Sequence, residues 1–304
     1  MDLSRLTTER RNPASAHIDS CTTLEMVTIM QQEDSKIAAA IQKILPDIAR
    51  AIDETSLRLQ EGGRLFYLGA GTSGRLGILD ASECPPTYGT DPELMQGLIA
   101  GGIPAIFRAQ EGAEDNPGLA VHDLKEHGFS AKDVLVGIAA SGRTPYVIGG
   151  LKYARELGAL TIALACSEHA EIAALADIAL TPVTGPEVVT GSTRMKAGTA
   201  QKLVLNMLST GTMIKLGKVY GNLMVDVKAS NKKLEERAIR IVMEGSGCAR
   251  SEAETALQEA GGHAKLAILM VVAGVSASEG QRLLDCTAGH LAAAIRQAAG
   301  GTQA

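Results

Sequence analysis

The sequence predicts an α/β protein with a doubly wound, five-stranded parallel sheet, N-terminal helices and a small C-terminal all-helical bundle. Short apolar runs alternate with helix-like stretches from residue 64 to about residue 230. Two of these runs stop at glycine and hydroxyl residues and then turn into a helix. After residue 231 only helical periodicity remains. Such alternation is typical of a parallel sheet covered on both faces.

The N-terminal region predicts an irregular arm followed by helices. Residues 1–20 show no regular apolar spacing. Thr22 and Glu25 have the spacing of a capping box, which opens a helix. A second helical run begins at Ser35 with isoleucines at helical spacing, and we expect Pro46 to kink it.

The central region supplies the sheet and its covering helices. The strand-like runs are 64–68, about 95–100, 133–139, 159–165 and 178–182. The helix-like stretches lie near 73–82, 117–127, 145–157, 168–176 and 192–216. Ligands of such sheets bind beyond the carboxyl ends of the strands, which is where the glycine and hydroxyl residues stand.

The last part of the chain differs in character. We therefore divide the chain into an α/β domain with its helical arm, residues 1–231, and a helical bundle, residues 232–304. The expected bundle helices are Leu234–Glu244, one opened by a capping box at Ser251 and Glu254, one over about 263–273, and one from Ser276 towards Gln297.

Composition excludes several classes of protein. The 304 residues are 45% hydrophobic, which is ample for a sizeable core. A net charge of -5 disfavours nucleic acid and anionic membrane surfaces as partners. The longest apolar run, 266–274, is too short for a membrane span, and the polar N-terminus has no signal-peptide core. Five cysteines without a C-x-x-C pair fit a reduced, cytoplasmic setting.

Two loops predict a site for a phosphorylated small molecule. Gly69–Arg75 and Ala140–Thr144 each follow an apolar run and precede a helix. Backbone N–H groups at a helix N-terminus stabilise anions, glycines allow close approach, and hydroxyls add donors. Either loop alone would be an ordinary capped turn, but the pair favours phosphate. The side chains expected at this site are Thr72, Ser73, Ser141, Arg143 and Thr144.

Two further loop features allow more than one interpretation. Gly69-x-Gly71-x-x-Gly74 matches the dinucleotide fingerprint, but no acidic residue ends a second strand about 20 positions later, so a nicotinamide cofactor is disfavoured. A third loop, Thr190–Lys196, places Ser192 and Lys196 before a long helix. Phosphate binding, a subunit contact and an ordinary helix start all fit it.

Two glutamates are candidates for proton transfer. The prolines after Cys84 predict that the helix ends there, which puts Glu83 at a helix C-terminus. The helix dipole would raise its pKa and suit a general acid, although a solvated glutamate fits equally well. Glu114 lies beside two other acidic residues. It is interpreted either as a general base or as part of an exposed loop. The scattered histidines suggest no catalytic metal.

The motifs together resemble the N-acetylmuramic acid 6-phosphate etherase family. The most specific segments are Leu68–Gly77, Asp80–Thr87, Ala139–Tyr146 and Gly191–Thr199, and the resemblance covers essentially the whole chain. This family belongs to the sugar-isomerase-type phosphosugar-binding domains and is similar to half of the glucokinase regulatory protein. The resemblance therefore implies an α-β-α sandwich and a C-terminal bundle that looks like a ubiquitin-associated domain.

The resemblance also implies a reaction. A lyase of this family cleaves the D-lactyl ether of N-acetylmuramic acid 6-phosphate to N-acetylglucosamine 6-phosphate and D-lactate, in cytoplasmic recycling of cell-wall sugars. It implies a homodimer with no metal or nucleotide cofactor. The family's acid falls on Glu83 and its second active-site glutamate on Glu114. Two other functions use the same loops: a phosphosugar isomerase, and a sensor that binds a sugar phosphate without turnover.

Overall fold

The computed structural model describes residues 7–226 and 232–300. Contacts between residues divide the chain into two compact units, the first comprising residues 1–82 and 92–209 and the second residues 83–91 and 210–304. The predicted boundary at residue 231 lies outside the described residues, as do the first six residues of the predicted arm.

The first unit contains the predicted parallel sheet. All five expected strands are confirmed: β1 (Leu65–Gly69), β2 (Met95–Ile99), β3 (Val134–Ile138), β4 (Leu160–Leu164) and β5 (Ile178–Leu180). Their order is β2-β1-β3-β4-β5, and every neighbouring pair is parallel. The chain leaves β1 towards one edge and later builds towards the other, so the switch point lies between β1 and β3.

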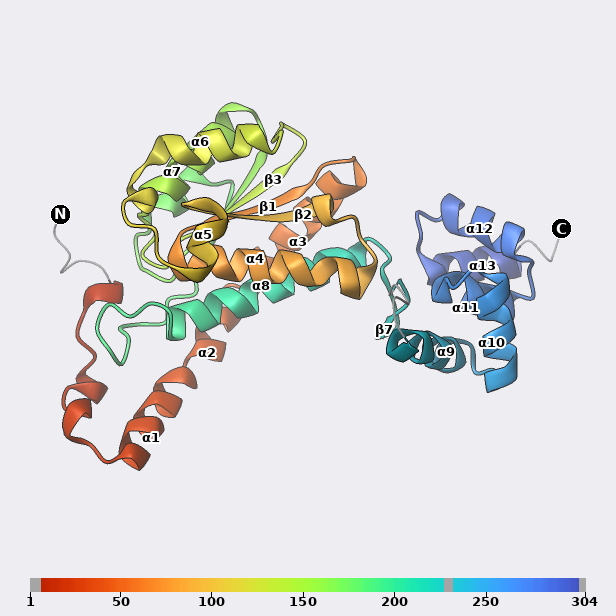
Figure 1. Ribbon diagram of the computed structural model, residues 1–304, viewed down its shortest axis with the longest axis horizontal. Helices are drawn as coiled ribbons and strands as arrows, with labels where there is room; N and C mark the ends of the chain where they lie inside the picture. The colour runs from red at the N-terminus through yellow and green to blue at the C-terminus, as the bar shows by residue number, and fades with distance from the viewer. Residues whose placement is uncertain (1–6, 227–231, 301–304) are drawn as a thin grey trace. The chain divides into compact units, whose positions relative to one another are not determined.

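Helices cover both faces of this sheet (Figure 1). On one face lie α6 (Pro117–Glu126) and α7 (Pro145–Glu156). On the other lie α4 (Gly71–Tyr88) and α8 (Lys196–Lys215), while α3 (Leu45–Gln60) packs against β5. A fully buried strand reads as a continuous apolar run because both of its faces are covered, and all five residues of β1 are buried.

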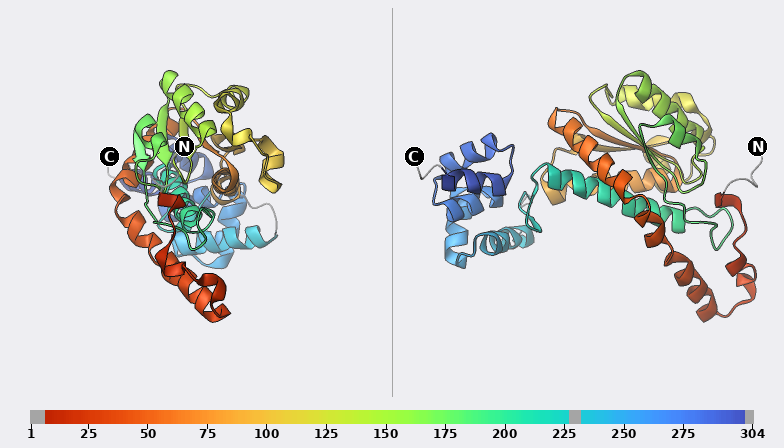
Figure 2. Two further views of the ribbon diagram at one scale, coloured as in Figure 1. Left: turned by 90° about the vertical axis from the view of Figure 1, so that its left-hand side faces the viewer. Right: turned by 180° about the vertical axis from the view of Figure 1, so that it is seen from behind.

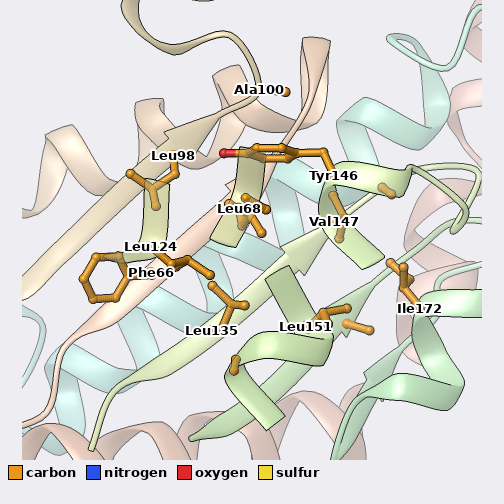
Figure 3. Close-up of a cluster of buried hydrophobic side chains, with 14 of the residues drawn as sticks. Phe66, Leu68, Leu98, Ala100, Leu124, Leu135, Tyr146, Val147, Leu151 and Ile172 are labelled. Atoms are coloured by element: carbon orange, nitrogen blue, oxygen red, sulfur yellow. The ribbon is translucent and has the colours of Figure 1, made fainter. Parts of the chain in front are cut away.

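Alternate residues of β1 serve opposite faces. Phe66 and Leu68 pack into the apolar cluster under α6 and α7, together with Leu135, Val147 and Leu151 (Figure 3). This face of the sheet is therefore a dry, close-packed layer.

On the opposite face, the Tyr67 hydroxyl donates a 2.8 Å hydrogen bond to Asp80 of α4. The same carboxylate accepts from Asn206 Nδ2 at 2.7 Å and Ser209 Oγ at 3.1 Å, both on α8. Burying a carboxylate requires such partners. One acid thus ties the strand to two helices.

The N-terminal helices differ in part from expectation. The capping box at Thr22 and Glu25 is confirmed and opens α1 (Thr23–Asp34). The second run is broken rather than kinked, into α2 (Ile37–Gln42) and α3, because Pro46 stands in the first turn of α3, where its missing N–H costs nothing. Figure 2 shows α1 extending away from the sheet.

Three other predictions in the central region need correction. The helix expected near 168–176 is a short 3₁₀ stretch, Glu171–Leu175. A one-and-a-half-turn helix, α5 (Gly102–Phe107), was not expected. The helix expected to end before the paired prolines instead continues through Pro85 and Pro86 to Tyr88.

Helix α4 tolerates its prolines because the φ angle fixed by the proline ring is close to that of an α-helix. Helical backbone hydrogen bonding also resumes after the two prolines. Gly89 N donates to Pro85 O at 2.9 Å. Cys84 and Tyr88 on either side are buried, so continuing the helix keeps apolar surface out of water. The cost is two missing backbone donors, which a packed helix end can absorb.

The second unit is mainly helical. It contains a two-stranded hairpin, β6 (Val219–Tyr220) with β7 (Leu223–Met224), and five helices: α9 (Lys232–Ser246), α10 (Arg250–Glu259), α11 (Ala264–Ala273), α12 (Ala277–Cys286) and α13 (Leu291–Gly300). Helix α11 is central, since residues 264–270 are all buried. No single described helix is long and apolar enough to cross a membrane, although α11 and α12, bent by 105°, pass that test as a pair.

Two predictions in this unit were wrong in detail. Ser251 does not cap a helix, because α10 already begins at Arg250 after Ala249. The last expected helix is two helices: Ser276 caps α12 as predicted, but the chain breaks at Ala288, whose φ of 49° is left-handed, before α13. A positive φ cannot continue a right-handed helix.

Candidate active site

A cleft of about 400 Å³ lies at the carboxyl ends of β1 and β3. The two loops that leave these strands meet there because the strands are neighbours in the sheet. All five phosphate-site residues predicted from the two loops line it: Thr72, Ser73, Ser141, Arg143 and Thr144. Residues up to 72 positions apart in sequence thus share one wall at the switch point of the sheet.

The first loop is shaped by glycines. Gly71 has a φ of 52°, and a Cβ on Gly69 would lie 2.7 Å from the backbone nitrogen of Gly74. Side chains are therefore excluded where the chain turns from β1 into α4. The turn presents the N-terminus of an 18-residue helix to the cleft, which favours an anion.

Two buried donors lack hydrogen-bond partners: Arg143 Nε in the cleft lining, and Gln201 Nε2, which is not in the lining but belongs to a residue bonded to Ser73. Ser73 Oγ donates to Gln201 Oε1 at 2.9 Å, which fixes the Gln201 amide while its Nε2 stays buried without a hydrogen bond. Arg143 Nε is also buried without one, and among the described residues the guanidinium forms no ion pair. Buried donors without acceptors are costly, so the site is poised for an acceptor-rich ligand such as a phosphate.

Carboxylates form another part of the lining. Glu114 and Asp115 lie in a 3₁₀ turn, Ala113–Asp115, at the cleft. Glu114 also lines an adjoining pocket of about 250 Å³ with Arg75. The structure thus brings Glu114 to the predicted phosphate site.

Glu9 lines the cleft as well, and sequence reasoning missed it. Its Oε2 lies 3.2 Å from the place that a Cβ on Gly191 would occupy, and Gly191 has a φ of 77°. The arm that carries Glu9 is held by Asn12 Nδ2, which donates to Pro186 O, and by Ser15 Oγ, which donates to Val188 O. No local pattern marks such a residue, because its neighbours in space are more than 170 residues away in sequence.

The third loop contributes differently from the first two. Gly191 and Thr193 line the cleft, whereas Ser192 and Lys196 are not among its lining residues. Lys196 is buried, and its Nζ lies 2.5 Å from Glu33 Oε2. The role of Ser192 and Lys196 in binding phosphate stays a prediction.

Two buried acids hold this loop. Glu187 caps α8 by accepting hydrogen bonds from the backbone nitrogens of Lys196 and Ala197, and burial raises its pKa. Burial alone would also raise the pKa of Glu33, but hydrogen bonds from Lys196, Lys36 and Asn12 outweigh it and lower that pKa to about 2. Glu33 is therefore a carboxylate that anchors the loop beside the cleft.

Glu83 lies elsewhere on the same helix as the phosphate loop. It stands inside α4 rather than at its end, so the reasoning from a helix C-terminus was wrong. It is exposed, and it does not line the cleft. The role of Glu83 as the acid stays a prediction that rests on its sequence motif.

The cleft lining is rich in hydroxyls, carboxylates and one guanidinium, with no histidine or cysteine among its residues. Among the described residues, one group with metal-ligand chemistry is closely spaced, His122, Asp123 and Glu126, and it does not line the cleft. Asp123 there accepts a hydrogen bond from the Tyr146 hydroxyl at 2.6 Å.

Comparison with known proteins agrees with this architecture. Residues 47–155 match the N-terminal SIS domain of glucokinase regulatory protein, residues 122–211 the SIS domain, and residues 221–263 the C-terminal lid domain of glucokinase regulatory protein. The fold and the cleft therefore define a SIS-domain protein.

Curated relatives narrow this class. The chain is 60% identical over 273 residues to N-acetylmuramic acid 6-phosphate etherase of Clostridium beijerinckii, covering 90% of each chain. It is 59% identical to the etherase of Aliivibrio fischeri strain MJ11, covering 90% of this chain and 91% of that protein. A solved phosphoheptose isomerase from Neisseria gonorrhoeae is similar with a TM-score of 0.47 and 20% identity, over 65% of this chain and all of that one. The chain belongs to the N-acetylmuramic acid 6-phosphate etherase family.

Proposed function

We propose that this enzyme cleaves the D-lactyl ether of N-acetylmuramic acid 6-phosphate with water, giving N-acetylglucosamine 6-phosphate and D-lactate. The observation that carries the proposal is the convergence of the two phosphate loops and Glu114 in one cleft, in a chain about 60% identical to etherases over nine-tenths of its length. Recycling of cell-wall sugars is the setting that such a substrate implies.

The phosphate group of the substrate would bind to the two loops. A phosphate at the N-terminus of α4 would accept hydrogen bonds from Thr72 and Ser73, and from Ser141 and Thr144 of the second loop. Arg143 would supply the charge and use its free Nε. Because the phosphate is remote from the ether, its binding orients the sugar rather than activating the bond.

The chemistry needs one base and one acid. An alkoxide leaves poorly, so direct hydrolysis of the ether is slow. Opening the sugar to its aldehyde makes the C2 proton acidic, and a carboxylate removes it. The electron pair from the C2–H bond forms a C2–C3 double bond, the C3–O bond breaks, and an acid protonates the departing lactate oxygen. Water then adds to C3 and a proton returns to C2, with the two carboxyl groups exchanging roles.

We assign Glu114 as the base and Glu83 as the acid. Glu114 lines the cleft beside the phosphate loops, which supports its role. The assignment of Glu83 is supported by its motif, Ser82-Glu83-Cys84-Pro85, which matches the family pattern. Each proton transfer is worth roughly 10²–10⁴-fold in rate.

Deuterium exchange separates the two roles. In D₂O we expect Glu83→Gln to incorporate deuterium at C2 without releasing lactate, because the base still acts. Glu114→Gln should do neither, while both variants still show thermal stabilisation by the substrate. Glu156→Gln, an exposed glutamate of α7 that lines neither the cleft nor the adjoining pocket, is the control and should keep full activity. Normal lactate release by Glu83→Gln would refute its role as the acid, and substrate exchange without lactate in the unmodified enzyme would indicate an isomerase.

We further propose that the enzyme acts as a homodimer in the cytoplasm. Helix α1 extends from the sheet and exposes Leu24 and Val27 by 74% and 51%. Apolar side chains on a projecting helix fit a surface that a second copy covers. Light scattering at micromolar concentration should give twice the chain mass, and Leu24→Glu with Val27→Glu should halve it. A monomeric mass for the unmodified chain would contradict the proposal.

A further inference from the structure

A second, larger cavity lies within the second unit. Its volume is about 800 Å³, within the range of small-molecule sites. Its lining comes from Gly89, from residues on either side of the β6–β7 hairpin, from the start of α11, and from α12 with the turn that follows it, and none of these residues lines the cleft of the first unit.

Two lysines in this cavity share one carboxylate. Lys265 Nζ lies 2.7 Å and Lys218 Nζ 3.3 Å from the same oxygen of Asp226. Neither ammonium has another ion-pair partner among the residues that the structure describes. One negative charge thus faces two positive ones, leaving a local surplus of one positive charge.

This surplus is poorly solvated. Lys265 is only 8% exposed, and burial lowers its pKa. Keeping the ammonium of Lys218 close to the buried ammonium of Lys265 costs free energy unless an anion compensates the extra positive charge. A bound anionic group beside Lys265 and Lys218 would restore neutrality.

The remaining charged groups of the lining do not cancel the surplus. Asp285 is exposed and accepts a 2.8 Å hydrogen bond from Gln281 Nε2. Water and this amide therefore already stabilise its carboxylate. His263 is exposed too. Solvent and salt screen these exposed charges, whereas the ammonium of Lys265 is buried and that of Lys218 is only partly exposed. Asp285 instead offers an acceptor for a hydroxyl donor.

Space beside the ammonium is kept free by backbone. Gly289 has a φ of 78°, and a Cβ placed on it would lie 3.7 Å from Lys265 Nζ. The start of the ten-residue helix α11 also lines the cavity, and His263 at its N-cap forms no side-chain cap. The N-terminal end of α11 adds to the positive potential that Lys265 and Lys218 create.

We propose that this cavity is a second binding site, for a small hydroxylated anion whose phosphate or carboxylate sits at Lys218 and Lys265. Hydroxyls of the ligand would donate to Asp285 at the rim. The site is distinct from the cleft, and the proposal holds whether or not the cleft carries out the proposed reaction. Because both products of that reaction are hydroxylated anions, they are natural probes alongside inorganic phosphate.

The test uses the full chain with its cleft disabled by Ser141→Ala and Arg143→Ala. Calorimetric titration with inorganic phosphate, N-acetylglucosamine 6-phosphate and D-lactate should still show one bound anion per chain. Adding Lys265→Met should weaken this binding at least tenfold. Lys152→Met, at an exposed lysine of α7, is the control and should leave it unchanged.

The Lys265→Met chain keeps Asp226 paired with Lys218, so we expect it to fold. Should circular dichroism show it unfolded, Lys218→Met replaces it, and the expected loss of binding is the same in direction. The proposal is overturned if none of the three probes binds the cleft-disabled chain at millimolar concentration. It is equally overturned if Lys265→Met and Lys152→Met bind alike. Lactate release by the unmodified enzyme is measured separately and does not enter this result.

Discussion

Replacing Glu33 by glutamine should destabilise the first unit strongly at neutral pH. The change removes the buried carboxylate that pairs with Lys196 while keeping its shape. Breaking a buried pair by removing one partner leaves the other charge uncompensated, which costs about 3–5 kcal/mol.

The pH dependence follows from the lowered pKa. The pKa of Glu33 falls from 4.5 to about 2 on folding, since the hydrogen bonds from Lys196, Lys36 and Asn12 outweigh the effect of burial. A depressed carboxyl pKa stabilises the fold above pH 4.5, and this contribution is lost as the pH falls towards 2. It amounts to about 3 kcal/mol at pH 7 and about 1 kcal/mol at pH 3.

Urea unfolding at pH 7 and at pH 3, followed by circular dichroism, measures this contribution of Glu33 to the free energy of unfolding. We expect the gap between wild type and Glu33→Gln to be about 3–5 kcal/mol at pH 7 and to narrow by about 2 kcal/mol at pH 3. Lys36→Met is the control: Lys36 also bonds Glu33, but its side chain is 60% exposed, so its loss should cost under about 1 kcal/mol. A gap below about 1 kcal/mol at pH 7, or one that does not change with pH, would refute the reasoning.

Three further outcomes are expected. Ser141→Ala should raise KM about tenfold or more with kcat retained, because the phosphate contact exists in the ground state; a fall in kcat alone would contradict this. Glu9→Gln should lower KM about twofold, since it removes a negative charge from an anion-binding cleft, and steady-state kinetics showing a higher KM would count against that role. Asp80→Ala should lower the free energy of unfolding by about 2–4 kcal/mol, because two buried donors and one half-buried donor lose their acceptor; a loss under about 1 kcal/mol in urea would show that these donors find other partners.

The sheet and the two main loops could be predicted because their signals are local. A strand buried on both faces is a continuous apolar run, as in Leu65–Gly69. The glycines at 69 and 71 mark the turn that follows it. The meeting of this turn with the loop containing Ser141 then follows from one topological rule for parallel sheets, so the sequence brings five lining residues of the cleft together, while their role in binding phosphate stays a prediction.

What the sequence could not provide depends on long-range contacts. The partner of Lys196 is Glu33, 163 residues earlier, and no local pattern in the loop indicates this ion pair. The rule that prolines end a helix fails at Pro85 and Pro86. Burial of Cys84 and Tyr88 stabilises the continued helix by more than the missing N–H groups destabilise it. In both cases tertiary packing overrides a local preference.

The N-terminal arm has a consequence for the order in which the newly made chain can assemble. Asn12 is synthesised 174 residues before its acceptor at Pro186. At about 5–20 residues per second this delay is roughly 10–35 s. All five strands precede Pro186 in the chain, so the arm can dock only after the whole sheet has been synthesised, and Glu33 lacks its lysine until residue 196 follows. The wall of the cleft that carries Glu9 is thus synthesised before the sheet but can be set in place only after it.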